Sequence, residues 1–399
     1  AVIGSGPAGL TCAHDLALLG YRVTVFEEAP VAGGMLVLGI PEFVLPRHIV
    51  EAEIDLIRRT GVEIRTGMAL GESMSMDDLW RDGFKAVLLA TGAWRSLELN
   101  VRGADLNGVL PALQFLRDYN RGKDLNTGEK VAVIGGGNVG IDAARAALRL
   151  GAREVNLVCL ECREEMPAFE WEIRIAEEEG VRVHPSLGVK AIPGKEGKVS
   201  GLDLVECTAI ESDGSGRIIP ILNETRTSSL DADTVIVAIG QSVEASRIEG
   251  IRNVEMSSGR TVSVDPDTMA TGAPGIFAAG DAVAGAGTVV EAIAAGKRAA
   301  ASIDRYFRGE AAFDFPQPDE VIEVPDDRLP RFVKRSNRVE MPVLPVRERL
   351  GAGRNEVVEQ GYSEKPARSE ATRCLSCPVC GNCMYDRFQI CYETATRLL

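Results

Sequence analysis

Residues 1–10 form a short apolar strand followed at once by a glycine-rich turn: Ala1-Val2-Ile3-Gly4-Ser5-Gly6-Pro7-Ala8-Gly9-Leu10. In a dinucleotide-binding turn, the first glycine allows the tight turn and the second lets the backbone approach a pyrophosphate. The third glycine lets the following helix pack closely on the strand. Gly4, Gly6 and Gly9 occupy these three positions. The sequence therefore predicts an α/β fold of the Rossmann type that begins at residue 1.

The residues that follow supply the context that such a turn requires. Helical spacing over residues 10–19 ends at Gly20, and an apolar strand over 22–26 ends at Glu27 and Glu28. A carboxylate at Glu27 lies where it would accept hydrogen bonds from an adenosine ribose. An ordinary strand-to-helix turn is the alternative, but the acidic residue at this spacing favours nucleotide binding.

A second copy of the same pattern begins at residue 131. A strand over residues 131–134 leads into the turn Gly135-Gly136-Gly137-Asn138-Val139-Gly140, and a helix over 141–150 ends at Gly151. The next strand, over 155–160, ends at Glu161. A repeated module is much less expected by chance than a single match, so the chain is predicted to contain two nucleotide-binding folds.

Other predicted strands also end in small residues. A strand over 86–90 ends at Thr91-Gly92, and a strand over 233–239 ends at Gly240. A third, over 274–281, ends at Gly280-Asp281, where the carboxylate could bind a polyol or cap the next helix. The apolar segment 33–46 is too rich in glycine and proline for one regular element, and it is placed either to cover a cofactor or to act as a structural lid.

Length and charge restrict the class of protein. The chain has 399 residues, enough for two or three domains, and a net charge of −14 that argues against nucleic acid or an anionic membrane as partner. No apolar run approaches the length of a membrane span. Because the sequence begins inside a strand, we expect that the natural chain starts before Ala1. We also expect a cytoplasmic protein.

Nine cysteines are distributed unevenly, and five of them crowd the end of the chain: Cys374, Cys377, Cys380, Cys383 and Cys391. Their two-residue gaps predict that four of the five hold a [4Fe-4S] cluster, with a zinc site of four thiolates as the competing interpretation. The crowding also indicates a reducing compartment. Cys159 and Cys162 form a separate CxxC pair; a redox dithiol is less favoured there than buried, inert cysteines.

The chain resembles the small subunit of glutamate synthase and its relatives in the order of five segments. These segments are the first turn, residues 33–46, the Gly135 turn, Met166-Pro167-Ala168 and residues 274–281. These relatives include part of dihydropyrimidine dehydrogenase and the flavin subunits of electron-bifurcating transhydrogenases. The resemblance implies that the first fold holds FAD. The residues expected to bind it are Gly4, Ser5, Gly6, Pro7, Ala8, Gly9, Glu27, Glu28, Gly33, Gly34, Met35, Ala90, Thr91, Gly92, Gly280, Asp281, Gly287 and Thr288.

The resemblance also implies that the second fold holds a nicotinamide nucleotide. The residues expected to bind it are Gly135, Gly137, Asn138, Val139, Gly140, Glu161, Arg163, Ala238, Ile239 and Gly240. Small subunits that use NADPH have a Tyr-Arg-Arg sequence where this chain has Cys159-Leu160-Glu161. A carboxylate repels a 2′-phosphate and accepts a hydrogen bond from a free 2′-hydroxyl, so NAD(H) is favoured, although Arg163 could still serve a phosphate.

Together with the order of these patterns, the resemblance implies an arrangement like that of the disulfide reductases. Residues 1–105 and 245–310 are expected to form a discontinuous FAD domain, 106–244 an inserted NAD(P) domain, 311–372 an extended arm and 373–399 a cluster-binding tail. The arm is expected to lie on the body or on a partner subunit, because its prolines interrupt any long element.

The predicted enzyme transfers hydride between NAD(P)H and FAD, and single electrons between FAD and [4Fe-4S] centres. Hydride transfer between cofactors needs no protein acid or base, so no catalytic residue is assigned. Expected partners are iron-sulfur or flavin subunits of a redox complex, including ferredoxin-linked and electron-bifurcating systems. The alternatives are a glutamate synthase small subunit that supplies NADPH electrons, and a non-catalytic assembly subunit.

Overall fold

The computed structural model describes residues 1–212, 218–257, 261–310, 337–351 and 355–372. The chain divides into one compact unit of residues 1–313 and 345–357 and a second unit of residues 314–344 and 358–399. The first unit holds both glycine-rich turns. No helix in the described ranges is both long enough and apolar enough to cross a lipid bilayer.

The first parallel sheet contains the N-terminal strand. Its strand order is β17-β4-β1-β2-β3, and every neighbouring pair is parallel. The strands span Ile276–Ala278, Val87–Leu89, Val2–Ile3, Thr24–Glu27 and Glu63–Thr66. Each strand except β3 is buried along its whole length, so β1, β4 and β17 are apolar runs, while β2 also buries the polar residues Thr24 and Glu27 at its ends.

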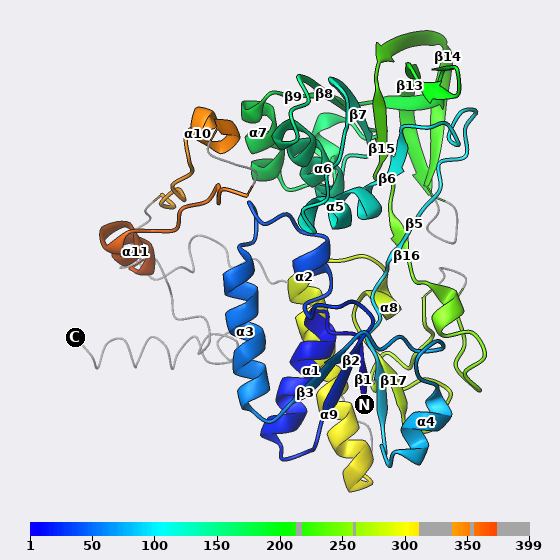
Figure 1. The fold of residues 1–399 in the computed structure, drawn as a ribbon, viewed down its shortest axis with the longest axis vertical. Helices are drawn as coiled ribbons and strands as arrows, with labels where there is room; N and C mark the ends of the chain where they lie inside the picture. The colour runs from blue at the N-terminus through cyan, green and yellow to red at the C-terminus, as the bar shows by residue number, and fades with distance from the viewer. Residues whose placement is uncertain (213–217, 258–260, 311–336, 352–354, 373–399) are drawn as a thin grey trace, which may run out of the picture. The chain divides into compact units, whose positions relative to one another are not determined.

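The second parallel sheet repeats this design (Figure 1). Its order is β6-β15-β7-β8-β9, with strands Val109–Pro111, Thr234–Val237, Lys130–Ile134, Glu154–Val158 and Val181–His184. The strand that precedes the glycine-rich turn is the central one in both sheets. The prediction of two Rossmann-like folds is therefore confirmed.

Helices cover the faces of the two sheets. In the first, α1 (Pro7–Leu18) packs against α3 (Arg47–Arg59) and α9 (Val289–Arg308). A Cβ on Gly296 of α9 would lie 2.4 Å from the Ala8 carbonyl oxygen, so a glycine is needed where α9 crosses α1. In the second, α6 (Asn138–Arg149) packs against α5 (Ala112–Asn120) and α7 (Glu170–Glu179). Both helices that follow a glycine-rich turn begin about three residues earlier than predicted.

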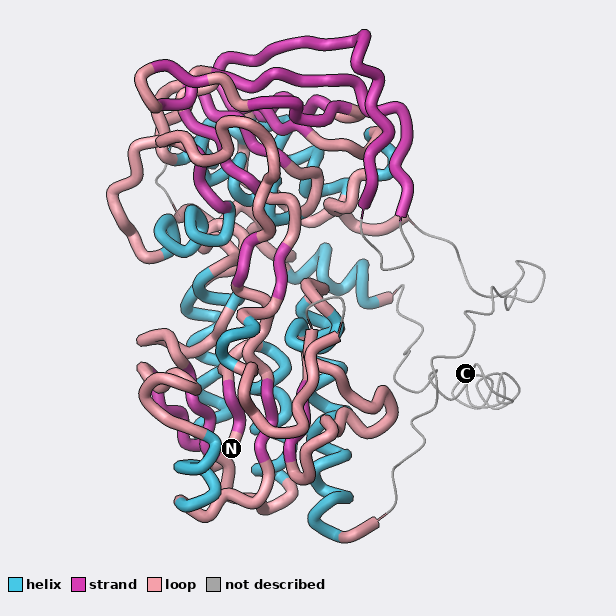
Figure 2. The backbone as a smooth tube through the Cα atoms, turned by 90° about the vertical axis from the view of Figure 1, so that its right-hand side faces the viewer, coloured by secondary structure: helices cyan, strands magenta, loops and turns pink. Residues whose placement is uncertain are grey.

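Two chain segments join the sheets. The short strands β5 (Arg95–Ser96) and β16 (Gln241–Ser242) pair in antiparallel fashion and lie between the sheets in Figures 1 and 2. The second sheet also carries an antiparallel sheet of β10 (Leu187–Ala191), β13 (Gly201–Ser212) and β14 (Ile218–Asp231), with a small hairpin of β11 (Gly194–Lys195) and β12 (Lys198–Val199).

The remaining elements are short and serve as connections. They are α2 (Met35–Leu38), α4 (Met76–Arg81), α8 (Asp281–Ala284), α10 (Val346–Gly351), α11 (Glu364–Ala371), and the 3₁₀ turns at 163–165 and 245–247. Helix α10 belongs to the first unit and packs against α7. The second unit contains α11 and a single antiparallel β-bridge between Val343 and Glu359.

Candidate nucleotide-binding sites

The first candidate site lies at the carboxyl edge of the first sheet. Because all five strands are parallel, the residues that follow β1, β2, β4 and β17 meet at one edge. These residues are the glycine-rich turn 4–9, Glu27, the segment 90–92 and the pair Gly280-Asp281. A Cβ on Gly4, whose φ is +105°, would lie 2.3 Å from the Ala90 carbonyl oxygen, so the first turn and the end of β4 are in direct contact.

The second candidate site reproduces these contacts with different residues. A Cβ on Gly135, at φ +126°, would lie 2.2 Å from the Ala238 carbonyl oxygen. The third glycine of each turn is also in the same close contact with the first. A Cβ on Gly9 would lie 2.1 Å from the Gly4 carbonyl oxygen, and a Cβ on Gly140 would lie 2.2 Å from the Gly135 carbonyl oxygen. The two turns are therefore the same structure built twice.

The middle glycine of each turn faces open space. A Cβ on Gly6 or on Gly137 would meet no atom within 4 Å. Each of these glycines is the N-cap of its helix, with no side-chain cap and no acidic residue in the first turn. Backbone N–H groups at a helix N-terminus attract anions, so both positions fit a dinucleotide pyrophosphate.

Glu27 connects three parts of the first site. One carboxylate oxygen accepts hydrogen bonds from the Ser5 amide (2.9 Å) and the Ser5 hydroxyl (2.5 Å), and the other accepts one from the Ala29 amide (2.8 Å). The Ser5 hydroxyl in turn accepts a hydrogen bond from the Gly33 amide (2.9 Å). A carboxylate has about four acceptor positions, so this arrangement leaves one for a ribose hydroxyl.

The segment that follows β2 lies directly over the first turn. A Cβ on Gly34 would lie 2.8 Å from the Gly6 Cα, and Met35 begins the short helix α2. Such close backbone contact is the arrangement expected of a segment that covers a cofactor at the turn.

Asp281 is the most perturbed acid at the first edge. Burial raises its pKa to about 6, while a hydrogen bond from the Gly287 amide acts in the opposite direction. Asp281 is the first residue of α8, and the cap of α9 is Thr288, in a capping box with Glu291. The Thr91 hydroxyl oxygen, also at this edge, is buried without a hydrogen-bond partner within the described structure.

Two further residues expected near FAD have partners of their own. Glu28 forms an ion pair with Arg247 (2.7 Å), and the Thr288 hydroxyl accepts a hydrogen bond from the Glu291 amide. Both side chains are therefore engaged with other residues of the protein.

At the second edge, Glu161 and Arg163 have different surroundings. A Cβ on Gly136 would lie 3.2 Å from a Glu161 carboxylate oxygen, so this carboxylate lies against the turn. Arg163 instead forms ion pairs with Glu170 (2.8 Å) and Glu177 (3.3 Å). Asn138, the first residue of α6, accepts a hydrogen bond from the Phe169 amide (2.9 Å).

Cys159 and Cys162 are both free thiols, and Cys159 lies beside the second turn, with its sulfur 3.2 Å from where a Cβ on Gly136 would be. Burial, followed by the charge of Glu161, raises the pKa of Cys159 to about 12, so this thiol is protonated and unreactive at neutral pH. Cys162 is partly exposed, so the expectation that both cysteines are buried is wrong for this residue. The five C-terminal cysteines, Cys374 to Cys391, lie outside the described residues.

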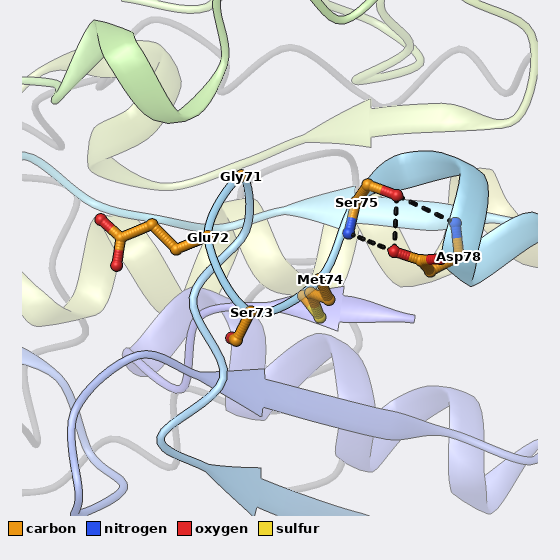
Figure 3. Close-up of a pocket in the computed structure, with 6 residues that line it drawn as sticks. All are labelled: Gly71, Glu72, Ser73, Met74, Ser75 and Asp78. Carbon is orange, nitrogen blue, oxygen red and sulfur yellow. Dashed lines mark hydrogen bonds between the residues drawn. The ribbon is translucent and has the colours of Figure 1, made fainter.

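A recess near α4 has a structural explanation. It is lined by Gly71, Glu72, Ser73, Met74, Ser75 and Asp78. Figure 3 shows that Ser75 and Asp78 bind one another, as the capping box of α4, while the Glu72 carboxylate points away from them. Ser73 is hydrogen-bonded to the Ala69 backbone, and Glu72 forms an ion pair with Arg247. Because each of these polar groups has a structural partner, we assign no function to the recess.

Comparison with known proteins agrees with this geometry. A family model for pyridine nucleotide-disulphide oxidoreductases matches residues 1–296. The chain belongs to this family. Among solved structures, FprA of Mycobacterium tuberculosis in complex with NADPH superimposes with a TM-score of 0.64 at 20% identity, over 79% of this chain and 86% of that one.

Curated relatives are subunits of larger enzymes. The chain is 43% identical over 387 residues to the NADP(+)-dependent formate dehydrogenase subunit beta of Moorella thermoacetica, covering 94% of this chain and 54% of the relative. It is 35% identical over 410 residues to the NADPH-Fe(3+) oxidoreductase subunit beta of Geobacter sulfurreducens, covering 94% and 61%. The chain thus spans little more than half the length of these two relatives.

The resemblance to glutamate synthase small subunits is also confirmed. The Escherichia coli glutamate synthase [NADPH] small chain is 34% identical over 321 residues, covering 76% of this chain and 67% of that one. All three relatives carry NADP or NADPH in their names, which bears on the nucleotide preference considered below.

Proposed function

We propose that the first site holds FAD, that the second holds a nicotinamide nucleotide, and that hydride passes between them. The observation that carries this proposal is the duplicated turn, with an open N-cap glycine at Gly6 and another at Gly137. In the first site, Ser5 and Glu27 would hold the adenosine end, and Gly280-Asp281 would contact the ribityl and pyrophosphate groups. Bound FAD would supply a two-electron acceptor that can also release single electrons.

We further propose that electrons leave the flavin singly through a [4Fe-4S] cluster in the tail. The support is the spacing of Cys374, Cys377, Cys380, Cys383 and Cys391, from which four ligands would be drawn. Iron and sulfide analysis, with EPR of the dithionite-reduced protein, tests this step. Stoichiometric zinc without iron would refute it.

For the nucleotide, the residues of this chain support NAD(H). The Glu161 carboxylate lies against the second turn, and Arg163 is already paired with two carboxylates. The names of the relatives support NADP(H) instead. Titration of the flavin with NADH and NADPH decides between them: tighter NADH binding supports the role of Glu161, and tighter NADPH binding refutes it.

Two variants test whether the charge of Glu161 itself, rather than the loss of any nearby carboxylate, sets the nucleotide preference. Glu161→Gln removes the repulsion toward a 2′-phosphate, so it should improve NADPH binding about tenfold, equal to ~1.4 kcal/mol, with little change for NADH. Glu164→Gln removes an exposed carboxylate nearby and serves as the matched control.

We propose that the chain works within a multi-subunit redox complex in the cytoplasm. Two observations support this: its relatives are named as beta subunits or small chains, and Cys12, Cys159, Cys162 and Cys207 are free thiols. A glutamate synthase small subunit is the second candidate, favoured by its sequence similarity. The identity of the subunit that co-purifies with the chain distinguishes the two.

The first experiment is cofactor analysis of the purified protein. We expect one FAD per chain and a saturable second site for NAD(P)H, followed by loss of the flavin's visible absorbance under anaerobic conditions. A chain that binds neither FAD nor NAD(P)H would instead be the non-catalytic assembly subunit.

A further inference from the structure

One phenylalanine that follows the first sheet in sequence is buried against helices of the second sheet. Phe43 lies in the connection between α2 and α3, and its exposed fraction is 0%. Its ring meets the ring of Tyr119 in α5 edge-on, with centroids 6.2 Å apart at an interplanar angle of 83°. The connection that follows β2 therefore reaches the helices of the second sheet.

Two arginines of α6 cover the same ring. The Arg149 guanidinium carbon lies 3.9 Å from the ring centroid of Phe43, and that of Arg145 lies 4.9 Å away. Both distances are within the range of a cation–π interaction, which is stronger in desolvated surroundings. The side chains of Arg145 and Arg149 are only 2% and 1% exposed.

Buried carboxylates hold these arginines in place. Glu179, whose side chain is 0% exposed, pairs with Arg145 (3.1 Å) and with Arg149 (2.7 Å). Glu172 pairs with Arg145 at 3.0 Å. Arg145 is fixed by two carboxylates and Arg149 by one, so both guanidinium groups present their faces to Phe43 in a constant direction.

The remainder of the segment is anchored at both ends. The Asn120 amide nitrogen of α5 donates to the carbonyl oxygens of Leu38, Gly39 and Ile40, at 3.1–3.2 Å. At the other end, Gly33 and Gly34 contact Ser5 and Gly6 of the first turn. One segment of about ten residues thus runs from the turn proposed to hold FAD to the helix whose N-terminus is the second turn.

We propose that Phe43 is a positioning residue for hydride transfer. By fixing α6 to the segment that covers the first turn, it sets the separation of the two nucleotide sites. This inference rests on the proposed function, and it assigns to Phe43 no contact with either cofactor. Loss of the ring should therefore slow hydride transfer while both sites keep their ligands.

The test is single-turnover reduction of the flavin by saturating NAD(P)H in the full chain. We expect Phe43→Ala to slow this step at least tenfold, with FAD content and the Kd for oxidised nucleotide changed less than threefold. Phe43→Tyr keeps a ring and should restore most of the rate. Phe43→Met, which fills the space without a ring, should fall between them and replaces the alanine variant if that one does not fold.

A matched control uses another buried phenylalanine. Phe115 in α5 is 2% exposed, and its ring has no cationic partner among the described ring contacts. Phe115→Met should lower stability without a selective loss of the reduction rate. A wild-type rate in Phe43→Met and Phe43→Ala, or an equal loss in Phe115→Met, overturns the inference. Absence of flavin reduction in the wild-type protein would instead refute the proposed function itself.

Discussion

A substitution at an open N-cap glycine should weaken nucleotide binding without destabilising the fold. An alanine at Gly137 adds a Cβ that meets no atom within 4 Å, and the φ of −86° suits any L-residue. Folding should therefore be unaffected. The added methyl group would instead occupy the space through which a pyrophosphate must approach the amide groups at the start of α6.

The expected loss follows from the contacts that the methyl group would displace. A hydrogen bond to a charged group contributes about 1.5–3 kcal/mol, so losing one phosphate contact weakens binding roughly 10- to 100-fold. Gly137→Ala should thus raise the Kd for NAD(P)H by this factor, with FAD content and unfolding free energy unchanged. Titration of the flavin signal and denaturant unfolding measure the two quantities.

Two further glycine variants act as controls. Gly6→Ala should lower FAD affinity and spare the second site, because Gly6 is the equivalent open glycine of the first turn. Gly140→Ala should destabilise the fold, since its Cβ would lie 2.2 Å from the Gly135 oxygen. Wild-type nucleotide affinity in Gly137→Ala would show that the second turn does not hold a pyrophosphate.

Three other predictions concern buried polar groups. Ser5→Ala removes the hydroxyl that joins Glu27 to Gly33, so FAD affinity should fall about tenfold or more by equilibrium dialysis; unchanged affinity would contradict this role. Glu179→Gln removes the buried negative charge that Arg145 and Arg149 share and should lower the unfolding free energy by about 3–5 kcal/mol, whereas Glu177→Gln, at a half-exposed position beside the partly exposed Arg163, should cost under about 1 kcal/mol. Equal losses would refute the network. Burial raises the pKa of Asp142 from 3.8 to about 7, so its ionisation opposes folding, and the cost grows as pH rises through this interval. In urea unfolding, the stability gain of Asp142→Asn over wild type should therefore grow between about pH 4 and about pH 7 and stay constant above that, and a pH-independent difference would contradict the assignment.

Local patterns in the sequence were enough to predict most of the two candidate sites. Glycine spacing and short apolar runs identified both turns and the strand ends at Thr91-Gly92 and Gly280-Asp281, because parallel strands bring such ends to one edge. The structure places all of them there. Turn geometry depends on neighbouring residues, and for this reason it can be recognised in a single sequence.

Contacts between distant residues were not predictable in the same way. Phe43 and Arg145 are about a hundred positions apart, and no periodicity links them. The presence of an arginine between alanines on a buried helix face was the available signal, because a buried cation requires a carboxylate partner. Likewise, nothing in the sequence indicated that Ser5 would bind both Glu27 and Gly33.

In the proposed function, hydride passes directly between the nucleotides held by two equivalent turns. The most direct test of this transfer is rapid anaerobic mixing of the FAD-loaded protein with nicotinamide nucleotide carrying hydrogen or deuterium at C4. We expect the flavin's visible absorbance to disappear more slowly with deuterium than with hydrogen, and more slowly still in the Phe43→Ala variant. A flavin that stays oxidised in the presence of saturating NADH and NADPH would contradict the proposed function.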